Sequence, residues 1–243
     1  MSEHFFRTLA WQAARRYPAR ERFARHFAYG KLTIDPVFAH LLARGLIPAQ
    51  ARVLDLGSGQ GILSALLLAA HERHRSGDWP EAWPAPPKLR GMRGIELMHK
   101  DVERARHAGD AATSFVCGDI RSTDFGAADV VVILDVLHYI DYAAQQDVLR
   151  RVRDALGAGG VLILRVGDES GSLRFRITVA VDRAIMRLRG HRLARLHCKP
   201  LEQWRRELTQ LGFRVEVVPM SAGTPFANAL LAARLAPRLS LLP

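Results

Sequence analysis

The chain has 243 residues, of which 49% are hydrophobic and 24% are charged, which fits a globular domain and excludes a disordered or fibrous protein. Its 35 Lys and Arg residues exceed its 24 Asp and Glu residues, and the net charge of +11 favours attraction to an acidic partner. The two cysteines, Cys117 and Cys198, form no C-x-x-C pair, so they indicate neither a disulfide framework nor a zinc knuckle.

Targeting signals are not visible in the sequence. No apolar run approaches the roughly 18 residues that a membrane-spanning helix needs. Residues 1–16 are interrupted by Glu3, His4, Arg7 and Arg15, which leaves no apolar signal core. We therefore expect a chain without a transmembrane segment, located in the cytoplasm.

Strand and helix patterns alternate along most of the chain. Residues 1–48 predict a helical lead-in, because apolar side chains recur there at helical spacing. The strands that follow are predicted at 53–56, 94–97, 113–116, 129–134 and 161–166, and the helices between them at 61–73, 99–107 and 142–156. Such alternation predicts a parallel sheet covered on both faces, because parallel neighbours need a crossover connection.

Two stretches depart from this alternation. Residues 74–92 contain four prolines and two tryptophans, which predicts a surface loop of unusual length. After residue 166 we expect a basic helical segment over 174–196 and a helix over 201–211. Two final strands, 213–218 and 226–233, are expected to form an antiparallel edge pair.

The most informative segment, residues 53–61, reads Val-Leu-Asp-Leu-Gly-Ser-Gly-Gln-Gly, a strand that runs into three alternating glycines and then a helix. Glycine suits this turn because the backbone must turn sharply and approach a ligand closely. A dinucleotide-binding loop would need its last glycine where Ile62 stands, and a phosphate-binding loop would need a Gly-Lys-Ser/Thr ending, which is absent. The carboxylate of Asp55 favours a ligand with cationic groups over a pyrophosphate.

At these residues the sequence resembles the class I S-adenosylmethionine-dependent methyltransferases, whose first motif is close to D-x-G-x-G-x-G. Residues 94–97 resemble the second motif, in which an acidic residue, here Glu96, accepts hydrogen bonds from both ribose hydroxyls. Residues 117–120 resemble the third motif, which borders the adenine. Residues 134–139 resemble the segment after the fourth strand, which lies beneath the methionine moiety and opens to the substrate.

The resemblance implies a Rossmann-like, doubly wound seven-stranded α/β sheet, mostly parallel with an antiparallel C-terminal edge pair. It adds N-terminal lid helices and a basic helical insertion after the fifth strand. The implied divisions are the lid (1–48), the cofactor-binding core (49–168), the helical insertion on the substrate side (169–200), and a C-terminal helix with the antiparallel strands (201–243).

The implied cofactor is S-adenosyl-L-methionine. The residues expected to bind it are Asp55, Gly57, Ser58, Gly59, Gly61, Glu96, Leu97, Gly118, Asp119, Ile120 and Asp135. Glu96 could instead be a solvated strand-end carboxylate, and Asp119 a helix cap or loop acid. Lys31, where related enzymes have a lid helix, is a candidate for the cofactor carboxylate or a solvated lysine.

Methyl transfer from a sulfonium is an in-line displacement, and a hydroxyl acceptor must also lose a proton. His138 is the candidate general base, with packing or capping beneath the cofactor as the alternative. Tyr139, placed on the substrate side, and Asp141 are no better supported as bases, and Asp141 is equally expected as the N-cap of the next helix. The histidines show no metal-ligand spacing, so no metal site is expected.

Basic residues concentrate on the expected substrate side. Between residues 174 and 206 there are ten basic residues and two acidic ones. On a helix, Arg176, Arg183 and Arg187 would flank an apolar stripe formed by Ile177, Val181, Ile185 and Leu188. This segment is a candidate acceptor platform, and the alternatives are an anionic membrane contact or a packed helix with a solvated basic face.

Short stretches near residues 30–36, 196–201 and 221–231 are similar to methyltransferases encoded with bacterial aryl-polyene and fatty-acid-like pathways. This resemblance implies a small aromatic or polyketide-like acceptor, either free or tethered to an acidic acyl carrier protein. An RNA methyltransferase is the first alternative, favoured by the pI near 10.7 but weakened because no RNA-binding module or N-P-P-Y-type motif is present. A non-catalytic cofactor-binding scaffold is the second.

Overall fold

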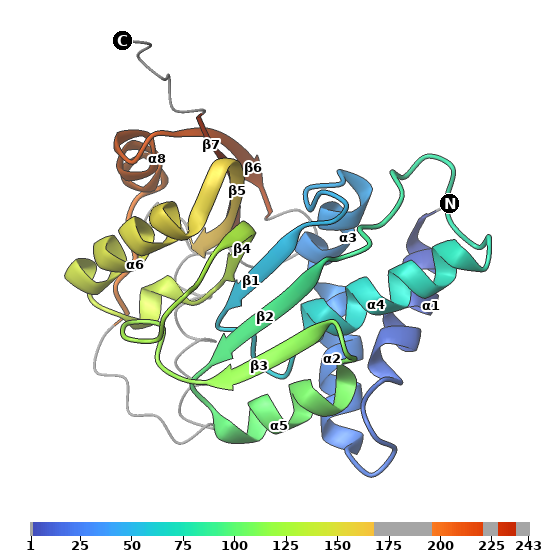
Figure 1. Ribbon diagram of the computed structural model, residues 1–243. Helices are drawn as coiled ribbons and strands as arrows, with labels where there is room; N and C mark the ends of the chain where they lie inside the picture. The colour runs from blue at the N-terminus through green and yellow to red at the C-terminus, as the bar shows by residue number, and fades with distance from the viewer. Residues whose placement is uncertain (1, 168–195, 221–227, 237–243) are drawn as a thin grey trace. The chain divides into compact units, whose positions relative to one another are not determined.

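The computed structural model describes residues 2–167, 196–220 and 228–236. Seven strands form a mixed sheet in the order β3-β2-β1-β4-β5-β7-β6, which confirms the predicted Rossmann-like fold class (Figure 1). The chain divides into two compact units, Met1–Asp124 and Phe125–Pro243, here called the N-terminal and the C-terminal unit.

Three parallel strands form the sheet of the N-terminal unit. They are β1 (Arg52–Leu56), β2 (Gly91–Glu96) and β3 (Thr113–Cys117), with β2 paired to both neighbours. Four of the five β1 residues are buried, as expected of a strand with helices packed against it. The register pairs Asp55 with Gly94 and Glu96 with Cys117, so the motif residues of all three strands come to the carboxyl edge of this sheet.

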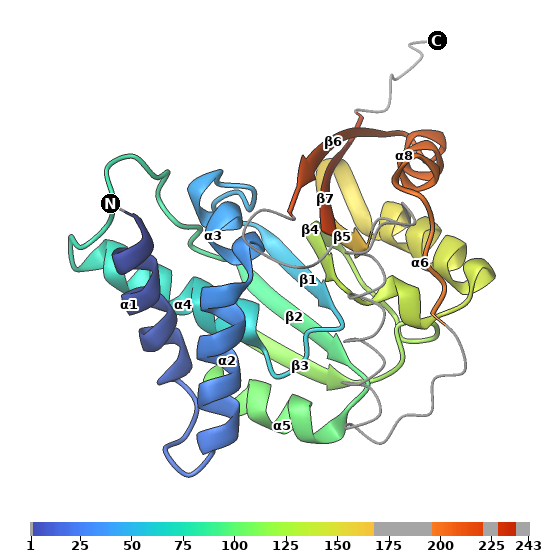
Figure 2. The same ribbon diagram turned by 180° about the vertical axis from the view of Figure 1, so that it is seen from behind.

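Five helices surround these strands. The sequence-predicted crossovers are α4 (Ile62–Arg75) and α5 (His99–Ala108), and the lead-in consists of α1 (Ser2–Ala14), α2 (Arg22–Ile34) and α3 (Pro36–Ala43). Helix α4 is buried on several sides because α1 packs along its outer face (Figure 2). Helix α3 starts separately from α2 because Pro36 cannot continue a helix and the Asp35 side chain caps the new one, accepting from Val37 N at 3.2 Å.

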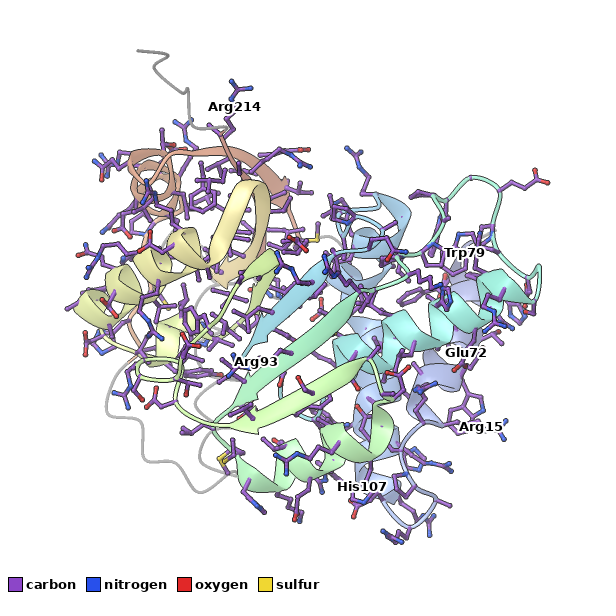
Figure 3. The ribbon with its side chains drawn as sticks, viewed as in Figure 1. Arg15, Glu72, Trp79, Arg93, His107 and Arg214 are labelled. Carbon is purple, nitrogen blue, oxygen red and sulfur yellow. The ribbon has the colours of Figure 1, made fainter. Side chains whose placement is uncertain are left out.

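The proline-rich connection lies at the opposite end of these strands from the motif residues. Gln50 N donates to Lys88 O at 2.8 Å and Arg90 N donates to Ala51 O at 3.1 Å, both where β1 and β2 begin. An aromatic cluster packs the connection onto α1, because the ring centroid of Trp79, which is labelled in Figure 3, lies 5.6 Å from that of Phe5. Its length therefore separates the motifs in the sequence without entering the carboxyl edge.

The C-terminal unit contains the remaining strands. Strand β4 (Ala128–Leu134) pairs in parallel with β5 (Leu156–Gly167), and β7 (Asn228–Leu235) pairs antiparallel with both β5 and β6 (Phe213–Pro219). The expected antiparallel edge pair is thus confirmed. The helices here are the short 3-10 turn η1 (Leu137–Tyr139), α6 (Tyr142–Ala155) and α8 (Leu201–Gln210).

Strand β5 begins five residues earlier than the sequence predicts. The glycines after α6 end that helix as expected, but the backbone continues extended rather than as a loop. Ala128 pairs with Leu156 before a bulge shifts the register to Val130 and Val161. The predicted basic helix over 174–196 lies outside the described residues. None of the helices within the described ranges is long and apolar enough to cross a membrane.

Candidate functional site

The glycine loop after β1 is fixed by backbone hydrogen bonds to the end of β2. The amides of Gly57 and Ser58 donate to Ile95 O at 2.8 and 3.2 Å. Gly61 has φ +78°, and a Cβ there would lie 2.9 Å from Ala105 Cβ. Both its backbone conformation and its packing against α5 therefore require glycine.

Gly59 has a different environment from Gly61. Its φ is +54°, but a Cβ at this position would meet no atom of the described residues within 4 Å. Its amide donates to Glu96 Oε2 at 2.9 Å. Within the described part of the chain the loop is therefore open at Gly59, where a ligand could approach the backbone directly beside a carboxylate.

Glu96 is held in place by backbone amides. Its Oε2 accepts from Gly59 N, and its Oε1 accepts from Met98 N at 2.9 Å. A carboxylate oxygen has a second lone pair, so each oxygen can still accept from a ligand. The side chain is half-buried and oriented before any ligand arrives, which suits it to a pair of neighbouring donors such as two hydroxyls.

Asp55, one strand away, is almost fully buried at 5% exposure. Burial, together with the negative charge of Glu96, raises the pKa of Asp55 to about 7. Two neighbouring carboxylates with little water around one of them form a site that a cationic ligand would stabilise. This electrostatic arrangement agrees with the prediction of a ligand with cationic groups.

The third motif is tied to the same edge, but its acid has a partner in the protein. Gly118 N donates to Glu96 O at 2.9 Å, and a Cβ on Gly118 would lie 2.4 Å from Thr123 Oγ1. Asp119 accepts from Arg121 Nε and Nη2 at 2.9 and 2.6 Å, and these bonds hold the pKa of Asp119 below its usual range. The sequence analysis missed Arg121, because nothing in the local pattern marks it as the partner.

Two apolar side chains expected at the cofactor differ in exposure. Leu97, directly after Glu96, is 56% exposed, whereas Ile120 is buried. An exposed leucine beside the pair of carboxylates leaves apolar surface available for a planar ring.

The side chains of Ser58 and Lys31, both predicted to bind the cofactor, have neighbours within the protein. A Cβ on Gly94 would lie 2.6 Å from Ser58 Oγ, so the serine hydroxyl is packed against β2. Lys31 Nζ pairs with Asp35 Oδ2 at 2.9 Å, one turn along the chain. Ser58 thus contributes its backbone hydrogen bond to the loop, while Lys31 forms an ion pair with Asp35, the residue that caps α3.

The structure adds two residues that the sequence analysis did not assign to the site, Gln60 and Tyr17. The Tyr17 hydroxyl donates to Gln60 O at 2.9 Å, and Gln60 Nε2 donates to Ala24 O at 2.8 Å. Both side chains are buried, and burial raises the pKa of Tyr17. The sequence shows only a glutamine between two glycines, and the burial that requires it to have hydrogen-bond partners is seen in the structure.

In the C-terminal unit, Asp135 follows β4 in a left-handed conformation with φ 60°. Its carboxylate accepts from Arg165 Nε at 2.8 Å and from Arg165 Nη2. Arg165 is 1% exposed and lies on β5. The sequence analysis missed this arginine, whose burial on an otherwise apolar strand is explained by the bidentate pair.

His138 and Tyr139 form most of η1, with their rings 4.1 Å apart. His138 is buried, and desolvation lowers its pKa to about 4, with Asp135 opposing and Arg165 adding to the shift. The imidazole is therefore a weaker base than the unperturbed side chain on which the sequence prediction relied. Asp141 accepts from Ala144 N at 2.9 Å, which confirms the N-cap alternative for that residue.

Gln145 connects the η1 segment to residues that follow the insertion. Its Nε2 lies 3.0 Å from Leu137 O, 3.1 Å from Ile140 O and 2.7 Å from His197 O. His197 N donates in turn to His138 O at 2.9 Å. Arg165, before residues 168–195, pairs with Asp135, and His197, after them, contacts His138 and Gln145. Both flanks are therefore anchored on residues 135–145. The predicted substrate-side residues Arg176, Arg183 and Arg187 lie outside the described residues.

Residues 23–218 match the profile of a methyltransferase domain. The chain is similar in structure to an O-methyltransferase family protein from Burkholderia thailandensis, with 20% identity and a TM-score of 0.61. The match covers 94% of this chain and 64% of the Burkholderia chain, so this chain spans less than two thirds of that protein.

A second similar structure is magnesium protoporphyrin IX methyltransferase from Synechocystis PCC 6803 with bound S-adenosylhomocysteine. The identity is 20%, the TM-score is 0.57, and the match covers 96% of this chain and 98% of that one. No curated protein matches the sequence. These likenesses establish the fold, and the profile covers most of the chain, including the glycine loop and Glu96. The chain belongs to the methyltransferase domain family.

Proposed function

We propose that this chain is an S-adenosylmethionine-dependent methyltransferase that acts on a small aromatic or acyl-type acceptor. The observation that supports it best is the carboxyl edge of the N-terminal unit. There the open backbone at Gly59 lies beside a Glu96 carboxylate held by two amides. The name of the Synechocystis structure, which holds S-adenosylhomocysteine, agrees with this cofactor.

The residues present fit the cofactor. S-Adenosylmethionine supplies a methyl group on a positively charged sulfur. Glu96 would accept the ribose hydroxyls with its free lone pairs, and Asp55 would supply negative charge for the cationic part. Leu97 and Ile120 would border the adenine ring, while Asp119, held by Arg121, would face its amino group.

The other residues predicted for the site have no contact within the described part of the chain that supports a role in binding. Asp135 and Lys31 stay predictions as cofactor contacts, and Tyr139 and the three insertion arginines stay predictions for the acceptor side. For His138 we favour the packing role over the general base, because an imidazole with a pKa of about 4 gains little by taking a proton from a hydroxyl at neutral pH.

The acceptor class is implied by the resemblance and is supported by the name of the Synechocystis structure, a methyltransferase of magnesium protoporphyrin IX. We further propose that the acceptor can be presented by an acidic acyl carrier protein, which would be attracted by the excess of basic residues between 174 and 206. An RNA acceptor is the competing proposal, supported by the pI near 10.7.

Two measurements test the proposal in sequence. Calorimetry with S-adenosylhomocysteine should show saturable binding, and no binding at millimolar ligand would refute every methyltransferase proposal. Transfer of labelled methyl groups should then occur to a small-molecule extract and not to total RNA. Labelling of RNA alone would replace the small-molecule proposal with the RNA one.

A further inference from the structure

The connection between α1 and α2 contacts the glycine loop through two buried side chains. Helices α1 and α2 lie side by side (Figure 2), and residues 15–21 join them. The Tyr17 hydroxyl donates to Gln60 O at 2.9 Å, and Gln60 Nε2 donates to Ala24 O at 2.8 Å. Arg25 Nε donates to Tyr17 O at 2.8 Å, which fixes Tyr17 to the first turn of α2. We call the two bonds that join Tyr17, Gln60 and Ala24 the α1–α2 clamp.

The clamp fixes one particular peptide group of the glycine loop, the one between Gln60 and Gly61. Its carbonyl oxygen accepts from Tyr17, and its amide, Gly61 N, donates to Ser58 O at 3.0 Å. The preceding amides of the loop, at residues 57–59, donate to the end of β2. The glycine loop is thus held on one side by β2 and on the other by the α1–α2 connection.

The burial of Gln60 indicates that this residue is not explained by stability alone. Gln60 and Tyr17 are both buried. No donor among the described residues reaches Gln60 Oε1. A buried acceptor without a donor is unfavourable, and an apolar side chain of similar size would avoid that cost. The contact that Gln60 Nε2 makes with α2 is therefore the feature that favours an amide at this position.

A second set of contacts links the same connection to the other side of the candidate site. Arg104 of α5 donates through Nε to Glu21 Oε2 at 3.3 Å and through Nη1 to Asp101 Oδ1 at 3.2 Å. Asp101 N donates to Met98 O at 3.0 Å, and Met98 N donates to Glu96 Oε1 at 2.9 Å. The α1–α2 connection therefore reaches both the glycine loop and the residues that orient Glu96.

We propose that Tyr17 is a positioning residue for the cofactor, which holds the glycine loop through Gln60 in the conformation that leaves Gly59 open beside Glu96. This inference rests on the proposed function and adds a residue to its site. The Tyr17 hydroxyl gives its proton to Gln60 O, so it acts through the loop and not on the ligand. A loop that is ordered before the ligand arrives loses less conformational freedom on binding, which strengthens the affinity.

The test removes the hydroxyl alone. In ligand-free Tyr17→Phe, hydrogen–deuterium exchange of the amides at residues 57–61 should be at least threefold faster than in wild type. The dissociation constant of S-adenosylhomocysteine, measured by calorimetry, should rise roughly three- to tenfold, the usual effect of one neutral hydrogen bond. Circular dichroism at the same temperature verifies folding.

The matched control is Tyr142→Phe. The Tyr142 hydroxyl also donates to a backbone carbonyl, Cys198 O at 3.0 Å, but it belongs to the C-terminal unit. Its removal should change neither the exchange of the loop nor the affinity. Gln60→Met removes the other bond of the clamp at nearly constant side-chain length, and it should change both measurements in the same direction as Tyr17→Phe.

Three results would overturn the inference. One is unchanged exchange of the loop in folded Tyr17→Phe. Another is faster exchange with an unchanged dissociation constant, which would assign the clamp to stability alone. The third is an equal loss of affinity in Tyr142→Phe. Failure of the proposed function has a different signature, because wild type itself would then not bind S-adenosylhomocysteine.

Discussion

Glu96 holds the glycine loop through Gly59, and its remaining lone pairs are the proposed acceptors for the ribose hydroxyls of the cofactor. We expect Glu96→Ala to weaken S-adenosylhomocysteine binding roughly ten- to a hundredfold, since a hydrogen bond to a charged group contributes about 1.5–3 kcal/mol. Calorimetry measures the affinity, and circular dichroism verifies folding. Glu103→Ala, an exposed acid on α5, is the matched control. Unchanged affinity in a folded Glu96→Ala variant would remove Glu96 from the site.

The raised pKa of Asp55 predicts that cofactor binding depends on pH. Its folded pKa of about 7 lies above the ordinary value of 3.8, so the ligand-free protein binds more protons than the unfolded chain between about pH 4 and 7. Stability from this group is therefore present below pH 4 and is lost as the pH rises through 7. A cationic ligand favours the ionised form, so binding should release a proton.

We accordingly expect the affinity for S-adenosylhomocysteine to rise about tenfold from pH 6 to pH 8, following the ionised fraction of Asp55. Calorimetry in two buffers of different ionisation enthalpy measures the released proton. Asp55→Asn should lose both the pH dependence and the proton release. An identical pH profile in that variant would show that another group titrates.

Strand-end acids and alternating glycines could be read from the sequence, because their spacing alone places them at one edge of a parallel sheet. The partners of these acids could not. Arg121 and Arg165 pair with Asp119 and Asp135 through geometry that spacing does not encode, and burial then determines the pKa of His138. Residue types therefore predicted that the motif residues share one edge of the sheet, but they did not predict the hydrogen-bond partners or the pKa values of individual groups.

At the scale of elements, Gln145 joins η1, the start of α6 and the residues after the insertion. We expect Gln145→Leu to lower the free energy of unfolding by about 1–3 kcal/mol, because buried carbonyls lose their donor. Thermal unfolding measures this loss. Gln146→Leu, at the exposed neighbouring position, should change Tm little. Equal Tm values for the two variants would show that the Gln145 contacts contribute nothing to stability.

Hydrophobic periodicity located most helices and strands. The differences between prediction and structure lie at element boundaries, where the local sequence is compatible with more than one backbone conformation. The spacing predicted a helical lead-in without dividing it into helices, and Pro36 with the Asp35 cap separates α2 from α3. The glycines after α6 predicted the end of that helix, and the helix does end there. Glycine also tolerates an extended backbone, so β5 begins directly after α6. The proline-rich connection was correctly expected as a loop, while its packing onto α1 depends on contacts between residues distant in the sequence.

At the scale of the whole molecule, the net charge of +11 gives the carrier proposal a measurable signature. If Arg176, Arg183 and Arg187 attract an acidic carrier protein, the association rate should fall steeply as ionic strength rises to 0.15 M, where the Debye length is about 8 Å. Replacing all three by Glu should abolish carrier binding and leave S-adenosylhomocysteine binding intact. The measurement is stopped-flow association across salt concentrations.

The matched control replaces three exposed arginines around the α1–α2 connection, Arg15, Arg20 and Arg22, by Glu. This variant should retain most of the carrier association rate. Equal loss in both triple variants would mean that only the overall charge matters. Equal rates for wild type and the Arg176, Arg183 and Arg187 variant at every salt concentration would eliminate the carrier proposal.

The anchoring of both flanks of residues 168–195 has an evolutionary consequence. Arg165 is fixed by Asp135 before this stretch, and His197 is fixed by His138 and Gln145 after it. Both contacts lie outside the stretch, so we expect the stretch to be exchangeable as a cassette when the two anchors are kept. If the stretch contacts the acceptor, as we propose, substitution or recombination within it would change acceptor preference while selection on the glycine loop and Glu96 continues unaltered. Homologues should therefore diverge fastest between these two anchors, and a chimaera that exchanges only this cassette is the natural route to redirect the enzyme.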